Sequence, residues 1–211
     1  MVYQNRNEAA IILAGKLEKF RKEDGIVLAI PAGGVPIGSI VAGELDFPLE
    51  PAMSKKIGHP FHKEFAIGAV TLHGTMIQDN EMGVDKEYIH SESESILRSL
   101  KEKFRMFMGS RIPTPLKGKT VILVDDGIAT GNTIISIIGA IRKQRPARII
   151  VAVPVSPPSA ARKITALADE FICPLIPEDF DSVGQYYMEF KQISDEEVIN
   201  ELSKVNAKTL R

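Results

Sequence analysis

Short runs of apolar residues recur along the chain, and each is followed by turn-forming residues and then by a helical pattern. The three clearest runs are residues 26–30, 121–124 and 149–153. Because each run is apolar throughout rather than at alternate positions, it predicts a strand that is covered on both faces, as in a parallel α/β sheet. Weaker patterns predict further strands at residues 49–54, 65–72, 75–78 and 170–173.

Helical patterns occupy the stretches between the predicted strands. In residues 8–22, the apolar side chains of Leu13, Leu17 and Phe20 fall on one face of a helix. The other predicted helices span residues 36–45, 85–108, 131–143, 158–168 and 195–205. The alternation of strands and helices predicts an α/β fold with a doubly wound, mainly parallel sheet flanked by helices.

The length of 211 residues favours a single domain that spans residues 1–211. We expect its core at about residues 24–175. Residues 57–64 are expected to form a flexible loop. Residues 174–211 combine an irregular, aromatic-rich stretch with the last predicted helix, and we expect them to form a small hood and C-terminal segment.

Charge and cysteine content exclude several classes of protein. The chain has 26 Lys and Arg residues against 27 Asp and Glu residues, which gives a net charge of −1. Proteins that coat a nucleic-acid polymer or bind a membrane through a polybasic patch are usually strongly basic, so neither function is expected. The single cysteine, Cys173, excludes a disulfide framework and a Cys-rich zinc site. With no run of 18 apolar residues and no signal-peptide pattern, we expect a soluble, cytoplasmic protein.

Residues 121–133, with the sequence VILVDDGIATGNT, combine a buried strand, two carboxylates, a short loop and the start of a helix. In open α/β sheets, ligands bind beyond the carboxyl ends of the strands. Gly131 and the free N–H groups at a helix N-terminus can surround a phosphate, and two loop threonines add hydroxyl donors. The carboxylates of Asp125 and Asp126 suit a vicinal diol or a hydrated Mg²⁺ ion. Together these features match a ribose 5-phosphate.

Other interpretations of this segment fit less well. A P-loop requires a lysine directly after its last glycine, whereas Asn132 follows Gly131. The dinucleotide-binding fingerprint G-x-G-x-x-G follows none of the predicted strands. The structural alternative is an acidic strand end followed by an ordinary Thr/Gly helix cap.

Residues 121–133 resemble the motif that binds 5-phosphoribosyl 1-diphosphate (PRPP) in type I phosphoribosyltransferases. The two acidic residues, the Ala-Thr-Gly turn and the closing threonine all stand in register with that motif. Further stretches resemble a poorly characterised branch of predicted phosphoribosyltransferases, and these are residues 29–38, 55–70, 151–158 and 176–198. The resemblance therefore extends over most of the chain.

The resemblance implies the type I phosphoribosyltransferase fold with its hood, and it implies an enzyme. Such an enzyme is a pentosyl-transferring glycosyltransferase, which moves the 5-phosphoribosyl group from PRPP to a nitrogenous base and releases pyrophosphate. Its cofactor would be Mg²⁺, and its partners would be PRPP and the base. The enzyme would act in nucleotide salvage as a cytoplasmic homodimer. The identity of the base and the oligomeric state stay open.

The motif assigns roles to individual residues. Asp125 and Asp126 would hold the ribose hydroxyls and would contact Mg²⁺ directly or through water. Hypoxanthine–guanine enzymes carry an aspartate in the slot of Ala129, so the slot resembles that of adenine, uracil or orotate enzymes instead. The loop that would hold the 5-phosphate consists of Gly127, Ile128, Ala129, Thr130, Gly131, Asn132 and Thr133.

The loop after the first predicted strand would meet the diphosphate. It contains Ala32, Gly33 and Gly34, and glycines let backbone N–H groups approach an anion closely. Related sequences carry an arginine where Ala32 stands, so this chain lacks one cation there. The alternative is a simple strand-to-helix turn.

Two lysines and two aromatic residues complete the site that the resemblance implies. Lys55 and Lys56, at the end of the next predicted strand, would also meet the diphosphate, with Lys56 as a catalytic residue. Phe180 and Tyr186 in the hood would stack on the base. The alternatives are two solvated lysines and ordinary packing within an irregular cap.

Two other functions stay open. One is a regulator that senses PRPP or a nucleotide and has kept the fold but lost turnover, as the missing charge at Ala32 suggests. The other is an α/β nucleotide-binding protein of another class, such as a phosphatase or a kinase. That protein would bind ATP or phosphoesters without a preference for PRPP.

Overall fold

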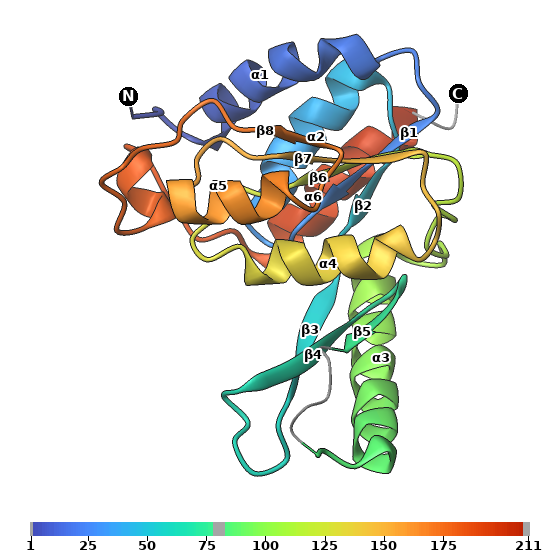
Figure 1. Cartoon of the computed structure of the whole chain (residues 1–211). Helices are drawn as coiled ribbons and strands as arrows, with labels where there is room; N and C mark the ends of the chain where they lie inside the picture. Colours follow the sequence, from blue (N-terminus) through green and yellow to red (C-terminus); the bar gives the residue numbers. More distant parts are fainter. Residues whose placement is uncertain (1, 78–82, 209–211) are drawn as a thin grey trace.

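A five-stranded sheet in which every neighbouring pair is parallel forms the centre of the molecule (Figure 1). The computed structural model describes residues 2–77 and 83–208. In spatial order the strands are β2 (Leu49–Pro51), β1 (Gly25–Ala29), β6 (Thr120–Val124), β7 (Arg148–Ala152) and β8 (Glu170–Ile172). The predicted doubly wound α/β fold is confirmed.

The strand order reverses between β1 and β6. From β1 the chain moves outward to β2, whereas β6, β7 and β8 follow one another on the other side. Ala29 pairs with Val124, and the N–H of Ile30 donates to the carbonyl of Val124 at 2.9 Å. The loops that leave β1 and β6 therefore begin side by side, at the place where open α/β sheets bind ligands.

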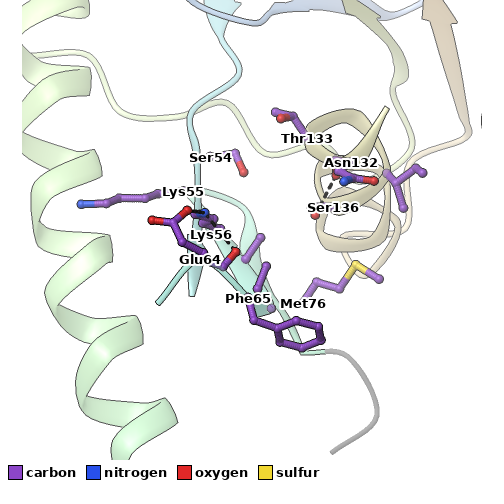
Figure 2. A pocket seen from close by; sticks show the side chains of 13 residues that line it. Ser54, Lys55, Lys56, Glu64, Phe65, Met76, Asn132, Thr133 and Ser136 are labelled. Atoms are coloured by element: carbon purple, nitrogen blue, oxygen red, sulfur yellow. Dashed lines mark hydrogen bonds and ion pairs between the residues drawn. The ribbon is translucent and has the colours of Figure 1, made fainter. Parts of the chain in front are cut away.

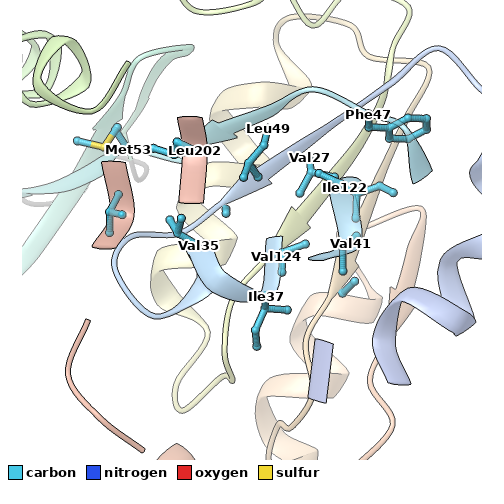
Figure 3. Close-up of a cluster of buried hydrophobic side chains, with 14 of the residues drawn as sticks. Val27, Val35, Ile37, Val41, Phe47, Leu49, Met53, Ile122, Val124 and Leu202 are labelled. Atoms are coloured by element: carbon cyan, nitrogen blue, oxygen red, sulfur yellow. The ribbon is translucent and has the colours of Figure 1, made fainter. Parts of the chain in front are cut away.

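Helices cover both faces of the sheet. The helices on one face are α1 (Arg6–Leu17), α2 (Gly34–Leu45), α6 (Asp195–Lys208) and the C-terminal half of α3 (Lys86–Met108), whereas α4 (Asn132–Arg142) and α5 (Pro158–Thr165) cover the other. Successive side chains of a strand point to opposite faces, so Val27 and Val124 enter the first core (Figure 3) and Leu28 and Leu123 the second. This two-sided burial explains why the strands are apolar throughout.

A second, antiparallel sheet forms an arm that projects from the core beside α3 (Figure 1). Its strands are β3 (Ser54–Gly58), β4 (Ala66–Thr71) and β5 (Gly74–Ile77), in that order. The single strand predicted at residues 49–54 was therefore wrong. The core strand ends at Pro51, and Lys55 and Lys56 lie within β3, not at the end of a core strand. Residues 49–53 are all buried, Glu50 included, so neither a change in burial nor a polar surface residue marks the end of the core strand.

The ends of several predicted elements also shift. The predicted helix over residues 8–22 begins at Arg6, where the side chain of Asn5 accepts the N–H groups of Asn7 and Glu8, and it ends in a 3₁₀ turn at Glu18–Phe20. Residue 78, at the end of a predicted strand, lies outside the described residues. The hood is irregular except for a 3₁₀ turn at Val183–Tyr186. Within the described ranges, no helix is long and apolar enough to cross a membrane.

Helix α2 packs closely on β1 at Gly38. A Cβ added to Gly38 would lie 2.7 Å from the Cβ of Ala29 and 3.1 Å from a methyl group of Leu49. The close approach leaves no room for a side chain, so this glycine fixes the distance between α2 and the sheet. Helix α2 also carries Gly34 at its start, so its position bears directly on the loop between β1 and α2.

We expect Gly38→Ala to lower the free energy of unfolding by about 1–3 kcal/mol, because the new methyl group overpacks the core. Gly43→Ala is the matched control on the same helix, since a Cβ there meets nothing within 4 Å. That variant should gain about 0.5–1 kcal/mol from its better helix propensity. Urea denaturation measures both, and equal effects would contradict the packing argument.

Candidate active site

Two loops meet beyond the carboxyl ends of β1 and β6. A Cβ on Gly33 would lie 2.0 Å from Oδ2 of Asp126, and a Cβ on Gly34 would lie 2.9 Å from both Cα of Asp125 and the carbonyl oxygen of Val124. Only glycines allow the two loops to approach this closely. The structure therefore brings together two groups that are about 90 residues apart in the chain, the predicted diphosphate loop and the predicted acidic pair. The Pro31–Ala32 peptide bond in the first loop is cis.

Asp126 forms an ion pair with Arg6, the first residue of α1. The Nε and Nη2 atoms of Arg6 donate to Oδ2 of Asp126 at 3.0 and 2.8 Å. The two side chains are only 10% and 14% exposed. No pattern in the sequence marks Arg6 as a site residue, because the contact joins residues that are 120 positions apart.

The neighbouring carboxyl, Asp125, lies in a different environment. Its Oδ1 accepts the backbone N–H of Asp126 at 2.8 Å. Burial raises the pKa of the Asp125 carboxyl well above its ordinary value, and the negative charge of Asp126 raises it further, although Arg6 opposes this. The two adjacent carboxyls thus differ, since Asp126 has a cation beside it and Asp125 resists ionisation.

The hood closes over the acidic pair. The hydroxyl of Tyr187 donates to the carbonyl oxygen of Asp126 at 2.6 Å. The Tyr187 ring lies 5.5 Å from the ring of Tyr3 and 5.1 Å from that of Phe190. Burial raises the pKa of the Tyr187 hydroxyl, so it stays protonated and keeps its role as donor. The N-terminal residues and the hood therefore jointly fix the main chain at Asp126.

The two hood aromatics that sequence analysis singled out lie against each other. The ring centroids of Phe180 and Tyr186 are 5.6 Å apart, and the hydroxyl of Tyr186 donates to the carbonyl of Asp179. Tyr186 is only 7% exposed, whereas Phe180 is half-buried. Phe180 therefore has more free ring surface, and base stacking by either residue stays a prediction.

The loop from Gly127 to Thr133 has a buried beginning and an exposed end. Val183 of the hood packs on Gly127, and the N–H of Ile128 donates to the carbonyl of Val155 at 2.9 Å. Ala129 and Thr130 are exposed. Gly131, with a φ of +80°, then turns the chain into α4, which begins with the exposed residues Asn132 and Thr133. N–H groups in the first turn of a helix lack intrahelical acceptors, so this end can bind an anion.

A cavity of about 530 Å³ opens between the start of α4 and the arm (Figure 2). Asn132, Thr133 and Ser136 line it from α4, and Ser54 and Lys56 are among the residues that line it from β3. Its size suits a small ligand, and we call it the arm cavity.

The two predicted lysines differ in direction. Both lysines are among the residues that line the arm cavity, but Figure 2 shows Lys56 beside Glu64, whereas the Lys55 side chain leaves β3 in another direction. This follows from the alternation of side chains along a strand. The Nζ atom of Lys56 lies 3.5 Å from Oε2 of Glu64, and both side chains are more than half exposed. A movement of this exposed pair would free Lys56 to meet an anion.

The acidic pair fits a Mg²⁺ ion that is bound mainly through water and substrate. Magnesium prefers oxygen ligands and keeps several waters when few carboxylates are available. Arg6 already occupies Oδ2 of Asp126, and a backbone N–H occupies Oδ1 of Asp125, which leaves one further oxygen on each. Across residues 2–77 and 83–208, no group of three or more His, Cys, Asp or Glu side chains forms a larger metal site.

Comparison with known proteins gives a family and a set of relatives. The family model of the phosphoribosyl transferase domain matches residues 1–191. Two Mycobacterium tuberculosis proteins, from strains CDC 1551 and H37Rv and each named "putative phosphoribosyl transferase", are 31% identical over 209 residues. The match covers 97% of this chain and 47% of each relative. The chain thus spans about half the length of the curated relatives it matches.

Two solved structures are also similar. The crystal structure of the protein TT1426 from Thermus thermophilus has 32% sequence identity and a TM-score of 0.85, and the match covers 97% of this chain and 99% of that one. The crystal structure of a purine phosphoribosyltransferase from Pyrococcus horikoshii has 18% sequence identity and a TM-score of 0.52, and the match covers 92% of this chain and 95% of that one. The second likeness concerns the fold alone.

The contact between the hood and Asp126 generates a prediction. Tyr187→Phe removes the hydroxyl by which a buried side chain satisfies the partly buried carbonyl of Asp126, so we expect the free energy of unfolding to fall by about 1–3 kcal/mol. Tyr88→Phe is the control, because the Tyr88 hydroxyl donates to the carbonyl of Gly58 in the arm at 2.9 Å from a side chain that is only half-buried. Chemical denaturation should show the larger loss for Tyr187→Phe, and equal losses would argue against the hood contact.

Proposed function

The chain belongs to the phosphoribosyl transferase domain family, and from this premise we propose that it transfers the 5-phosphoribosyl group of PRPP to a nitrogenous base and releases pyrophosphate. The observation that carries the proposal is the contact of the Gly33–Gly34 loop with Asp125 and Asp126 at the switch point between β1 and β6. This arrangement offers acceptors for a diol and backbone donors for phosphates within one site.

The ribose would lie over the acidic pair. After the internal bonds of the site are formed, Oδ1 of Asp126 and Oδ2 of Asp125 are the oxygens with room for ribose hydroxyls. The 5-phosphate would lie at the start of α4, where Ala129 to Thr133 present backbone N–H groups and hydroxyls. Holding both ends of the sugar fixes C1 for reaction, which is the main source of catalysis in this scheme.

The diphosphate would lie at the loop after β1. The N–H of Gly34 donates to the carbonyl of Ile30 at 3.0 Å, so the N–H groups of Ala32 and Gly33 would be the ones to bind the anion. Lys56 would add a positive charge from the arm cavity. A bound Mg²⁺, held by Asp125 and Asp126 directly or through water, would offset part of the diphosphate charge.

The reaction is a substitution at C1 of the ribose. A ring nitrogen of the base forms a bond to C1 while the C1–O bond to the diphosphate breaks, and the electron pair leaves with the diphosphate. The residues of this chain orient the sugar and stabilise the departing charge rather than form a covalent bond. Phe180 and Tyr186 would meet the base, and residues 57–64 would exclude water as a flexible loop. The proposed setting is nucleotide salvage in the cytoplasm, with the chain acting as a homodimer.

A second candidate is a regulator that senses PRPP or a nucleotide without turning it over. Ala32 favours it, because the diphosphate loop presents no charged side chain of its own. The family match argues against the third possibility, a phosphatase or kinase of another class.

The assignment of the ribose site is tested with the double variant Asp125→Asn/Asp126→Asn. Without these carboxylate acceptors, we expect the affinity for PRPP in Mg²⁺ buffer to fall at least about tenfold, measured by calorimetry. Asp169→Asn is the control, since Asp169 pairs with Arg142 at the far end of α4. Unchanged affinity in the double variant would overturn the assignment.

Turnover is tested with a panel of bases, PRPP and Mg²⁺, read out as pyrophosphate release. We expect release with adenine, uracil or orotate in preference to hypoxanthine or guanine, because Ala129 offers no carboxylate to an oxopurine. Binding of PRPP without release for any base on the panel would favour the regulator instead.

A further inference from the structure

Arg6 joins three parts of the molecule at the acidic pair. Besides its two bonds to Oδ2 of Asp126, its Nη1 donates to the carbonyl of Lys191 at 2.7 Å. Its guanidinium carbon lies 4.1 Å from the centre of the Phe190 ring. The start of α1, the end of the hood and the acidic pair are thus held by one side chain.

This ion pair differs from the others in the described part of the chain. Arg6 and Asp126 are 10% and 14% exposed, whereas each of the other ion pairs there has at least one side chain that is 44% exposed or more. A buried ion pair contributes little net stability, because desolvation of two charges offsets their attraction. A gain in stability therefore does not explain why a buried ion pair lies at the acidic pair.

The charges at the site indicate such a role. Two neighbouring carboxylates would repel a ligand that carries a 5-phosphate and a diphosphate. Arg6 supplies one positive charge, which cancels the negative charge of Asp126. Asp125, which resists ionisation, adds at most one further negative charge to the site. Of the two carboxylate oxygens of Asp126, Arg6 bonds only to Oδ2, so Oδ1 is still available as an acceptor.

We propose that Arg6 is a positioning residue that neutralises Asp126 and fixes its carboxylate, so that the acidic pair can hold the ribose of a polyanionic ligand without repelling its phosphates. The inference rests on the proposed function, since it takes PRPP as the ligand. It assigns different duties to the two carboxyls. Asp126 is the paired acceptor, and Asp125 is the one without a cationic side chain in contact.

A purely structural role for Arg6 predicts different behaviour. If Arg6 only ties α1 to the hood, its loss should weaken every ligand of the site to the same extent. If it offsets charge, its loss should weaken PRPP more than ribose 5-phosphate, because the second ligand lacks the diphosphate. The ratio of the two affinities therefore separates the two roles.

Three variants of Arg6 and Asp126 separate the effect of the site's net charge from the effect of its hydrogen bonds. Arg6→Gln keeps hydrogen-bond donors but removes the positive charge, which leaves the negative charge of Asp126 uncompensated. Arg6→Lys keeps the charge with a poorer geometry. The double variant Arg6→Gln/Asp126→Asn removes one positive and one negative charge, so it restores the wild-type net charge without leaving an unpaired charge buried.

The experiment is calorimetry of PRPP and of ribose 5-phosphate, in one Mg²⁺ buffer, with each variant checked for folding by thermal melting. Relative to ribose 5-phosphate, Arg6→Gln should lose about tenfold in PRPP affinity, and added salt should reduce this loss. Arg6→Lys and the double variant should keep the wild-type ratio within about threefold. Arg142→Gln, which breaks the exposed pair with Asp169, is the control and should change neither affinity.

The outcomes distinguish a failure of the proposed function from a failure of the role proposed for Arg6. A wild-type protein that binds neither ligand overturns the proposed function, and the role of Arg6 with it. A wild-type protein that binds PRPP, together with an unchanged ratio in Arg6→Gln, overturns the role of Arg6 alone. If Arg6→Gln is unfolded, the double variant decides, because a ratio well below that of the wild type would then contradict charge compensation.

Discussion

The parallel pairing of β1 with β6 is the constraint on which the rest of the site depends. The two strands leave the sheet toward opposite sides, so their ends form a crevice. Both strands are apolar on both faces, so the hydrophobic pattern alone discriminates poorly between neighbouring registers. The contacts beyond the strand ends, of Gly33 with Asp126 and of Gly34 with the Val124 carbonyl, are made in the observed register. The contacts at the site and the packing of the core are thus both compatible with the same register of β1 against β6.

The sequence predicted the strands and helices whose burial is visible in a local hydrophobic pattern. It did not predict the contacts between residues that are far apart in the chain. The runs at 26–30 and 121–124 are apolar because helices cover both sides, and a pattern of this kind is visible without the fold. Residues 121–133 fix their own local geometry, since Gly131 at a φ of +80° and the start of α4 follow directly from the motif. The pairing of Arg6 with Asp126 depends instead on how the chain ends return to the sheet. Likewise, the break between Pro51 and Ser54 is set by the start of the arm, which the local sequence pattern does not reveal.

The proposed site would bind a negatively charged ligand with few charged side chains. Backbone N–H groups at the loop after β1 and at the start of α4 would make much of the contact, and they add nothing to the net charge of −1. Arg6 is directed to a carboxylate of the protein rather than to a ligand. Near neutrality overall therefore fits a site for a small anion and still disfavours a long polyanion.

The bonds of the hood to Asp126 also set an order for the assembly of the site during synthesis. Arg6 and Asp126 are made before Tyr187, Phe190 and Lys191, which emerge from the ribosome later. Helices and strands of the core can form on the nascent chain as they appear, because domains begin to fold from the N-terminal side. The acidic pair is enclosed only after the last irregular segment has folded back beside Tyr3. A chain released before residue 191 would thus contain the whole five-stranded sheet and still lack a finished site.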